Sequence, residues 1–280
     1  MREVKADDIK KTVELLCIEA NYNLPQDVLN TLKEKAYEEV SETGIEILNS
    51  IIENAEIAKV KEMPICQDTG IAVIFVEIGQ DVHVVGGSLS EAINNGVKDG
   101  YLNGYLRKSI VNDPFIRINT NDNTPPIVHY DIVGGDKLKI TVAPKGAGSE
   151  NMSALKMMKP SDGIEGVKKF IIDTVEASGP NACPPLVVGV GIGGNFEYAP
   201  LLAKKALLRP IDQRSSDGDV RALEEELLLK VNSLGIGPQG LGGRITALAV
   251  NIEKYPTHIA MLPVAVNISC HVTRHATAIL

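Results

Sequence analysis

Three of the four cysteines share surroundings that suit metal binding. Cys66, Cys183 and Cys270 each lie in a polar turn at the predicted end of a strand. Cysteine thiolates hold iron–sulfur clusters, and a cubane held by only three of them leaves one iron open to act as a Lewis acid. An open iron suits dehydration chemistry, because hydroxide is a poor leaving group and needs a cation to depart. The residues alone therefore predict a possible three-cysteine metal site.

The fourth cysteine has different neighbours. Cys17 recurs with Ile9, Val13 and Leu16 at helical spacing, so we interpret it as a small buried hydrophobe. The alternative is that Cys17 is a fourth cluster ligand. The protein would then be a non-catalytic electron-transfer or structural iron–sulfur subunit.

Two other motifs are weaker guides to function. The glycines of Gly189–Gly194 match G-x-G-x-x-G, but residues 209–212 lack the second strand ending in an acid that a dinucleotide site requires. A tight strand-to-helix turn is the favoured interpretation. His271 and His275 have the spacing of a zinc-protease pair, but Val272 stands where the general-base glutamate would be. We expect these histidines to make ordinary hydrogen bonds.

The elements that must position these residues follow from hydrophobic periodicity. The first sixty residues predict three helices, with Pro25 between the first two and the third running from about Gly44 to Val60. A Ser88-x-x-Glu91 capping box predicts a helix to residue 103. Further helices are expected after residue 163, at 199–208 and after 217, and strands at 71–78, 127–133, 137–143, 186–190, 246–252 and 259–266. The turn at residues 134–136 predicts a hairpin between the second and third of these strands.

The order of these elements indicates the fold class. Strands and helices are mixed without regular alternation, which favours an α+β or irregular mixed α/β fold. We expect one large domain over residues 1–280, with a helical layer over residues 1–60 and then mixed strands and helices. A chain of 280 residues can bury a core without a disulfide or a structural metal.

Composition excludes several classes of protein. Lys and Arg total 28 against 36 Asp and Glu, and there is no basic block, which argues against a nucleic-acid partner. No apolar run reaches the roughly 20 residues of a membrane helix, and the first residues lack a signal-peptide core. We therefore expect no membrane association and a cytoplasmic location, where thiols stay reduced.

Around the three cysteines the sequence resembles the class I, iron–sulfur fumarate hydratases. It is most similar to the alpha subunit of their two-subunit form, whose close relative is the alpha subunit of L-tartrate dehydratase. The resemblance runs from about residue 10 to the last residue. The matching segments are Ile65-Cys-Gln-Asp-Thr-Gly70, Tyr105-Leu-Arg-Lys-Ser109, Pro144-Lys-Gly-Ala-Gly-Ser-Glu-Asn151, Gly189–Gly194, Pro256-Thr-His-Ile-Ala260 and Cys270-His-Val-Thr-Arg274.

The resemblance implies a cofactor and a reaction. Cys66, Cys183 and Cys270 would hold a 4Fe-4S cluster, and the enzyme would reversibly hydrate fumarate to L-malate. The open iron would bind the substrate hydroxyl and one carboxylate. Dehydration of L-tartrate is the alternative reaction within the same family.

The resemblance also implies roles for individual side chains. Asp68 would handle a proton, with His258 as its partner, and Gln67 would contact the substrate. Arg107 matches a carboxylate-binding arginine, whose planar guanidinium can grip a carboxylate in two places. The turn of Lys145, Gly146, Ala147 and Gly148 would present backbone amides to an anion.

Each of these residues also has a structural alternative. Asp68 could simply shape a turn, Arg107 could be a solvated cation and His258 could be structural. The turn at residues 145–148 could be a plain loop. We expect Arg244 and Arg274, two further cations near strand or chain ends, to be structural.

A partner subunit is expected as well. Single-chain members of the family continue beyond the third cysteine into a domain that supplies further cations to the substrate. The present sequence ends ten residues after Cys270. We therefore expect a beta subunit to complete the active site, in a hetero-oligomer such as two alpha and two beta subunits.

Overall fold

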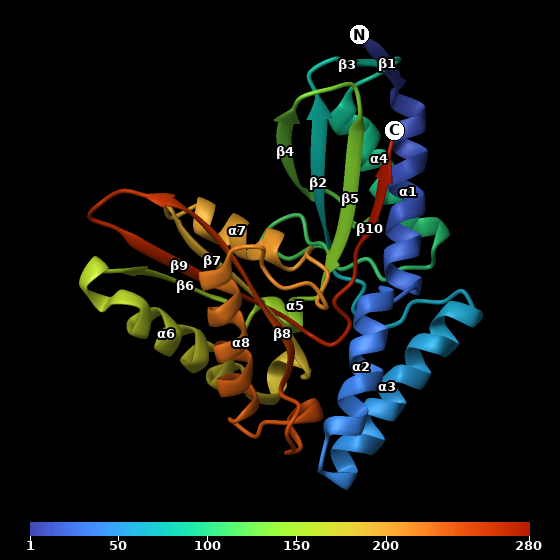
Figure 1. Ribbon diagram of the computed structural model, residues 1–280. Coiled ribbons are helices and arrows are strands. Elements are labelled where there is room, and N and C mark those ends of the chain that lie inside the picture. Colours follow the sequence, from blue (N-terminus) through green and yellow to red (C-terminus); the bar gives the residue numbers. More distant parts are fainter. The chain divides into compact units, whose positions relative to one another are not determined.

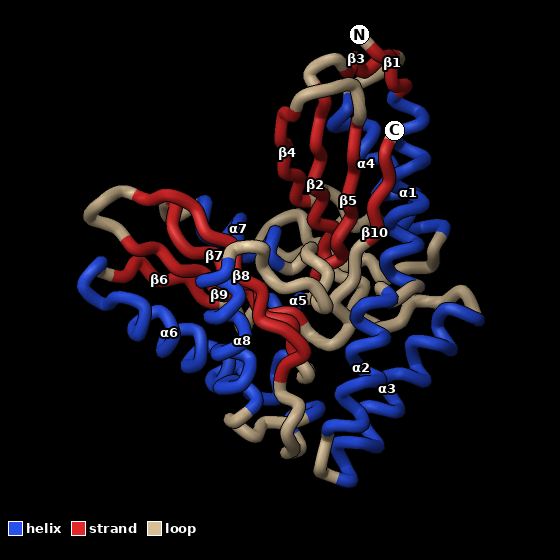
Figure 2. The backbone as a smooth tube through the Cα atoms, viewed as in Figure 1, coloured by secondary structure: helices blue, strands red, loops and turns tan.

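The computed structural model describes residues 1–280 and divides the chain into two compact units (Figures 1 and 2). The first unit consists of Met1–Leu24, Ala55–Ala147 and Arg274–Leu280, and the second of Pro25–Asn54 and Gly148–Thr273. Helices and mixed sheets occur in both, which confirms the mixed α/β class. The first sixty residues are largely helical, but their helices are divided between the units. The expectation of a single domain stays a prediction.

The first unit is built on a four-stranded sheet with the order β10-β5-β2-β4. Strand β2 pairs in parallel with β4 and antiparallel with β5. Helices α1 and α4 pack on one face of this sheet, and two short strands, β1 and β3, pair in parallel beside it (Figure 1). The bounds are β1 (Arg2–Lys5), α1 (Ala6–Tyr22), β2 (Ile71–Gly79), β3 (Val82–Val85), α4 (Leu89–Asn103), β4 (Ile127–Val133), β5 (Leu138–Lys145) and β10 (Ala276–Ile279).

The core of the first unit follows from strand alternation. Ala72, Ile74 and Val76 are every second residue of β2, and all three are buried against the two helices. Cys17 is fully buried on α1, where a Cβ on Gly100 of α4 would lie 2.8 Å from the Cys17 Cβ. The helices approach closely because glycine stands there. Burial of Cys17 is therefore confirmed.

The predicted hairpin between β4 and β5 is wrong, because β2 lies between these two strands. Residues that directly follow β2 make backbone hydrogen bonds with the turn that connects β4 and β5. Gln80 N donates to Val133 O, and Asp81 N donates to Gly135 O, each at 2.9 Å. Glycine-rich composition predicted a turn correctly, but it carried no information about which strand would pair across it.

The second unit has a four-stranded sheet with the order β6-β9-β7-β8. Strand β7 is parallel to β8 and antiparallel to β9. Helices α6 and α8 cover one face, and α7 covers the other. The bounds are α2 (Gln26–Glu38), α3 (Glu42–Val60), α5 (Ala147–Glu150), β6 (Ala154–Met158), η1 (Pro160–Asp162), α6 (Gly163–Ser178), η2 (Gly179–Ala182), β7 (Leu186–Gly194), α7 (Tyr198–Ala206), α8 (Gly218–Asn232), η3 (Pro238–Gly240), β8 (Ala247–Thr257) and β9 (Leu262–Ser269), with the ends of α3 and α5 shared between the units.

The glycine motif on β7 serves packing against α7. A Cβ on Gly191 would lie 2.0 Å from Ala199 O, and one on Gly189 would lie 2.2 Å from Ala203 O. No side chain fits at either position, so α7 can lie directly on the strand. Strand β7 ends at Gly194 and α7 begins at Tyr198, which confirms the tight strand-to-helix turn expected from the sequence. No helix is both long and apolar enough to cross a membrane.

Candidate active site

The topology of the first sheet gathers several candidate residues at one edge. Strands β2, β4 and β10 begin at the edge where β5 ends, because β5 runs antiparallel to β2 and β10 while β4 runs parallel to β2. The loop at residues 66–70 precedes β2, residues 107–126 precede β4, and the turn from Lys145 follows β5. The loops that carry Gln67, Asp68 and Arg107 therefore converge.

Asp68 is the most connected side chain at this edge. Its Oδ1 accepts a hydrogen bond from Gly70 N at 3.0 Å, and its Oδ2 accepts one from Ala147 N at 2.8 Å. The Asp68 N–H points to Cys66 Sγ at 3.4 Å, and the Cys66 thiol lies 3.5 Å from Gln67 Oε1. One carboxylate thus fixes the loop before β2 to the turn after β5, beside a half-buried cysteine.

Hydrogen bonds from buried side chains hold the loop at residues 66–70 in place. The Thr69 hydroxyl donates to Arg107 O at 2.8 Å, which fixes the backbone that carries the exposed Arg107 side chain. The Tyr101 hydroxyl donates to Thr69 O at 2.7 Å and lies 3.1 Å from Gly70 O, which also accepts from Asn123 Nδ2 at 3.1 Å. Burial raises the pKa of Tyr101, so its hydroxyl remains a donor.

The turn after β5 is in direct contact with this loop. Gly70 has φ +73°, and a Cβ there would lie 2.7 Å from the backbone of Lys145, so both conformation and space require glycine. Lys145 is buried, and a Cβ on Gly146 would lie 3.1 Å from Asp68 Oδ2. Ala147 begins α5 without a positive φ, so its methyl group is tolerated. The turn was expected to present backbone amides to an anion, and in this structure the Ala147 amide donates to the Asp68 carboxylate.

Arg274 also supports Asp68. Its side chain is buried, and Nη2 donates to the Asp68 carbonyl oxygen at 2.7 Å. Sequence reasoning gave Arg274 only a structural role and did not connect it with Asp68. The sequence carried no signal for this contact, because β10, which starts at the same sheet edge as β2, could not be predicted from periodicity.

Strand pairing in the second unit brings two of the three candidate cysteines to one edge. Val187 near the start of β7 is opposite Ser269 at the end of β9, so Cys183 and Cys270 flank neighbouring strand ends. His271 N donates to Cys183 O at 3.4 Å. Cys183 has φ +54°, a conformation that non-glycine residues seldom adopt.

The candidate cysteines are divided between the units, with Cys66 in the first and Cys183 and Cys270 in the second. Neither unit by itself contains a group of three or more His, Cys, Asp or Glu side chains that could hold a metal ion. All three cysteines are outside any disulfide and at least partly accessible, whereas Cys17 is completely buried. Burial raises the pKa of the Cys17 thiol, which opposes the thiolate form that ligates iron. Cys66, Cys183 and Cys270 are thus better suited to ligating iron than Cys17 is.

His258 lies elsewhere in the second unit. It is exposed in the turn between β8 and β9, where its Nδ1 accepts from Ala260 N at 3.2 Å. Strand β9 separates it from Cys270, and eight extended residues span roughly 25 Å. His258 instead lines a pocket of about 470 Å³ with Tyr198 and Tyr255. The second unit does not bring His258 to its cysteine pair.

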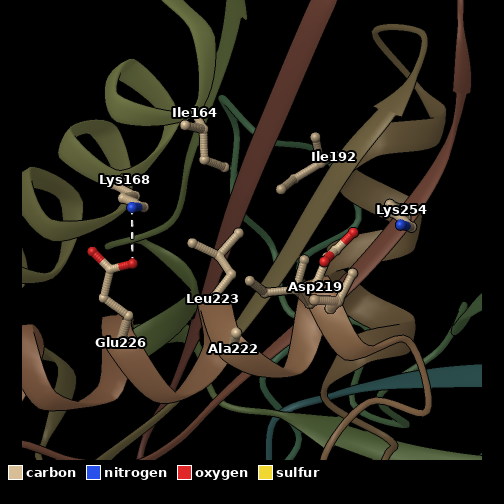
Figure 3. A pocket seen from close by; sticks show the side chains of 10 residues that line it. Ile164, Lys168, Ile192, Asp219, Ala222, Leu223, Glu226 and Lys254 are labelled. Atoms are coloured by element: carbon tan, nitrogen blue, oxygen red, sulfur yellow. Dashed lines mark ion pairs between the residues drawn. The ribbon is translucent and has the colours of Figure 1, made fainter.

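Another pocket contains none of the candidate residues. A largely apolar cavity of about 400 Å³ lies beside α6, α8 and the sheet of the second unit. Ile164, Ile192 and Leu223 line it, and Lys168 on its rim pairs with Glu226 at 2.8 Å (Figure 3). No cysteine or histidine lines this cavity.

Comparisons with known proteins identify the family. The family described as "Fumarate hydratase (Fumerase)" matches residues 10–279. A protein of Methanocaldococcus jannaschii, provisionally named an L(+)-tartrate dehydratase subunit alpha, is 46% identical over 276 residues, covering 96% of each chain. L(+)-tartrate dehydratase alpha subunits of Escherichia coli and Shigella sonnei are 36% and 35% identical over 261 residues, covering 92% of this chain and 86% of theirs. The chain therefore belongs to the class I fumarate hydratase family, whose members are iron–sulfur hydro-lyases, and is of the alpha-subunit type.

Proposed function

We propose that this chain is the alpha subunit of an iron–sulfur hydro-lyase that removes water from L-tartrate to give oxaloacetate. The observation that carries the choice of substrate is the name of the relatives, which match nearly the whole chain. The family resemblance implied fumarate as the main substrate, and the names of the relatives favour its alternative, L-tartrate. Hydration of fumarate to L-malate is the second candidate, because the family description names that activity.

The cofactor in this proposal is a 4Fe-4S cluster with Cys66, Cys183 and Cys270 as ligands. Their accessibility and the burial of Cys17 support this choice. When bound, such a cluster supplies one open iron as a Lewis acid for the departing hydroxyl group.

Asp68 is the proposed proton-handling group. Its carboxylate accepts two backbone hydrogen bonds. A carboxylate offers about four lone-pair positions, so it retains the capacity to take a proton from substrate. The fixed loop keeps the side chain in one orientation, which general acid–base catalysis requires. A catalytic role for His258 stays a prediction, and its distance from Cys270 along β9 makes Asp68 the stronger candidate.

The substrate-binding groups in the proposal are Gln67, Arg107 and the turn at residues 145–148. The Arg107 side chain is exposed, and the Thr69 hydroxyl fixes the Arg107 backbone. The guanidinium can therefore reach a substrate carboxylate while its backbone stays in place. A bidentate contact would orient one carboxylate of the substrate relative to Asp68. Gln67 lies beside Cys66 and Asp68 and would hydrogen-bond the substrate.

The proposal includes a beta subunit. The names of the relatives describe alpha subunits, which supports a second kind of chain. The loop before β4 also exposes Phe115, Ile116 and Ile118 by 91%, 73% and 60%. Exposed apolar clusters of this kind are typical of surfaces that another chain covers.

Purification of the chain together with its partner under anaerobic conditions tests the function. We expect about four irons per alpha chain and a higher kcat/KM for L-tartrate than for L-malate or fumarate. A higher kcat/KM for fumarate would select the second candidate. An iron-loaded complex that turns over none of the three substrates would exclude the hydro-lyase proposal.

A pair of cysteine variants separates the enzyme from an electron-transfer or structural subunit. Cys183→Ala should lose the cluster and the activity. Cys17→Ser should keep the cluster, although a hydroxyl in the core lowers stability. Cluster loss in Cys17→Ser, with the fold intact by circular dichroism, would favour four-cysteine ligation and the non-catalytic alternative.

A further inference from the structure

Strand β4 is an open edge of the first sheet, because it pairs only with β2. Figure 1 shows it at the left margin of that sheet. Four of its seven residues are exposed hydrophobics: Ile127, Tyr130, Ile132 and Val133 are 48%, 45%, 74% and 37% exposed. An apolar edge of this length is a template for pairing with another strand.

The other edges of the two four-stranded sheets carry features that discourage such pairing. Strand β10 has only four residues, β6 carries Lys156, and β8 carries Lys254 and Pro256 and pairs with β7 through register shifts. Strand β4 contains no lysine, proline or glycine, and it pairs with β2 without a register shift. Short length, lysine, proline and bulges are the usual means by which an edge avoids pairing. The open edge of β4 has none of them.

The backbone groups on the open side of β4 belong to alternate residues. Val133 O accepts from Gln80 N at 2.9 Å, so Val133 directs its backbone N–H and C=O towards β2. Alternation along the strand then turns the N–H and C=O groups of Val128, Tyr130 and Ile132 to the open side. A second strand can therefore hydrogen-bond to three consecutive outward-facing residues.

The sequence of β4 is complementary to itself in the antiparallel direction. In an antiparallel pair centred on Tyr130, His129 lies opposite Asp131 of a second copy. The imidazole can donate to the carboxylate, and no like charges lie opposite each other. The remaining pairs are all apolar: Val128 with Ile132, and Ile127 with Val133.

The charged pair falls at the closer kind of antiparallel position. His129 and Asp131 alternate in step with Val133, so their backbones face β2 and they would form non-hydrogen-bonded pairs with the second copy. The Cα atoms of such pairs are about 4.5 Å apart, and their side chains are near each other. The His129 ring also stacks on Phe75 with the ring centroids 5.2 Å apart, which orients the imidazole at this edge.

We propose that two copies of this chain associate through β4, by antiparallel pairing of β4 with β4 of the second copy about a twofold axis at Tyr130. The two four-stranded sheets then form one continuous sheet of eight strands. A twofold interface uses the same patch on both subunits, which a self-complementary strand supplies. The association involves neither the cysteines nor a reaction, so it is independent of the proposed function.

A cysteine at the axis tests the register. Tyr130 would lie opposite its own copy with the Cα atoms about 5.5 Å apart, which is within the range of a disulfide. Tyr130→Cys should therefore give a disulfide between two chains under mild oxidation. Ile132→Cys is the matched control, because the two copies of residue 132 would lie four residues apart along the strands, about 14 Å.

Both variants are made in the full chain and purified with the partner subunit. Disulfide-linked peptides are identified by mass spectrometry, because the accessible native cysteines can also oxidise. We expect a peptide pair joined through position 130 and none joined through position 132.

Ile132→Lys tests the apolar pairs. The change removes the contact with Val128 of the second copy twice in each dimer and places lysine on the edge. In sedimentation equilibrium of the complex, we expect the dissociation constant between the two alpha chains to rise about tenfold. Val60→Lys is the control, because Val60 is 82% exposed on α3 in the same unit, and it should leave that constant unchanged.

The contrary outcomes are distinct. No chain-to-chain disulfide at position 130, or equal disulfide formation at positions 130 and 132, would overturn the proposal. An unchanged dissociation constant in folded Ile132→Lys would do the same, as would a complex that holds one alpha chain at every concentration. If Ile132→Lys does not fold by circular dichroism, the comparison of Tyr130→Cys with Ile132→Cys decides. Protection of the thiol at position 130 by the partner subunit, without a disulfide there, would assign the edge to that subunit and refute self-pairing.

Discussion

Asp68 Oδ2 accepts the backbone N–H of Ala147 at 2.8 Å, across 79 residues of sequence. The bond joins the loop that leads into β2 with the turn that leaves β5, at the edge where those strands meet. The same carboxylate holds Gly70 N through Oδ1. Asp68 is the proposed proton-handling group, and its carboxylate also holds the loop before β2 against the turn after β5. The catalytic role and the structural role can be separated by experiment.

Asp68→Asn should reduce catalysis far more than stability. Asparagine keeps the shape and one acceptor oxygen, but it cannot accept from both Gly70 and Ala147 and cannot act as a base. We expect kcat to fall by about 10²–10⁴-fold, the usual contribution of general acid–base catalysis, with a stability loss of roughly 1–2 kcal/mol. Asp136→Asn, an exposed change in the same unit, is the control. A kcat near wild type in Asp68→Asn would assign Asp68 a purely structural role.

Tyr101→Phe should loosen the loop below the candidate site. The phenol hydroxyl is buried and donates to Thr69 O, so its removal leaves a buried carbonyl with fewer donors. We expect a loss of roughly 1–2 kcal/mol in denaturant unfolding at pH 7. Tyr37→Phe, at a side chain that is 92% exposed, should change nothing measurable.

The Tyr101 effect should also depend on pH. Burial raises the pKa of Tyr101 above its ordinary value of 10.0, so the stabilisation is complete below pH 10. Above pH 10 the unfolded chain releases this proton first, and the stability difference between wild type and Tyr101→Phe should shrink. A difference that stays constant through this range would contradict the assignment.

Glu39→Gln should weaken the second unit at neutral pH. Burial by itself would raise the pKa of Glu39, but backbone N–H groups of Arg244, Ser41, Ile245 and Val40 donate to its carboxylate and hold the pKa below its ordinary 4.5. Because the folded-state pKa is lowered, the carboxylate stabilises the fold above pH 4.5, and this contribution disappears as the pH falls through the lower folded value. We expect a loss of roughly 1–3 kcal/mol at pH 7 in denaturant unfolding and a flatter stability profile below pH 4.5. Glu42→Gln, at an exposed carboxylate, should keep the wild-type profile.

Gly191→Ala should be strongly destabilising, since its Cβ would lie 2.0 Å from Ala199 O and force α7 away from β7. Overpacking of this kind costs about 1–3 kcal/mol or more. Gly218→Ala is the control in the same unit, because a Cβ at that position would have no atom within 4 Å and the φ of Gly218 is not positive. Equal melting temperatures for the two variants would show that the packing of α7 on β7 does not require a glycine at position 191.

Much of this arrangement could be predicted from local pattern. The apolar run from Ile71 and the helix after Ser88 appear where periodicity placed them, and Ser88 accepts from Glu91 N as the capping box requires. Strands β1, β3, β6 and β10 were not predicted, because stretches of four or five residues carry too little periodicity. Only β-pairing could give these segments their structure, and pairing is not a local property.

The site shows the same division between local and distant information. The chemistry of Cys183 and Cys270 could be suspected from their polar turns at strand ends, but their common edge follows from the pairing of β7 with β9. The contacts of Arg274 with Asp68 and of Gln239 with Pro184 join residues far apart in sequence. No spacing rule relates such residues, so their roles emerge only from the folded chain.

The pairing of β10 with β5 has a consequence for biosynthesis. Strand β10 supplies an edge of the first sheet, and Leu280 exchanges two backbone hydrogen bonds with Leu138. Every residue of the second unit is translated before β10. Folding during synthesis proceeds as segments leave the ribosome, so the second unit can fold before β10 completes its pairing with β5 in the first sheet.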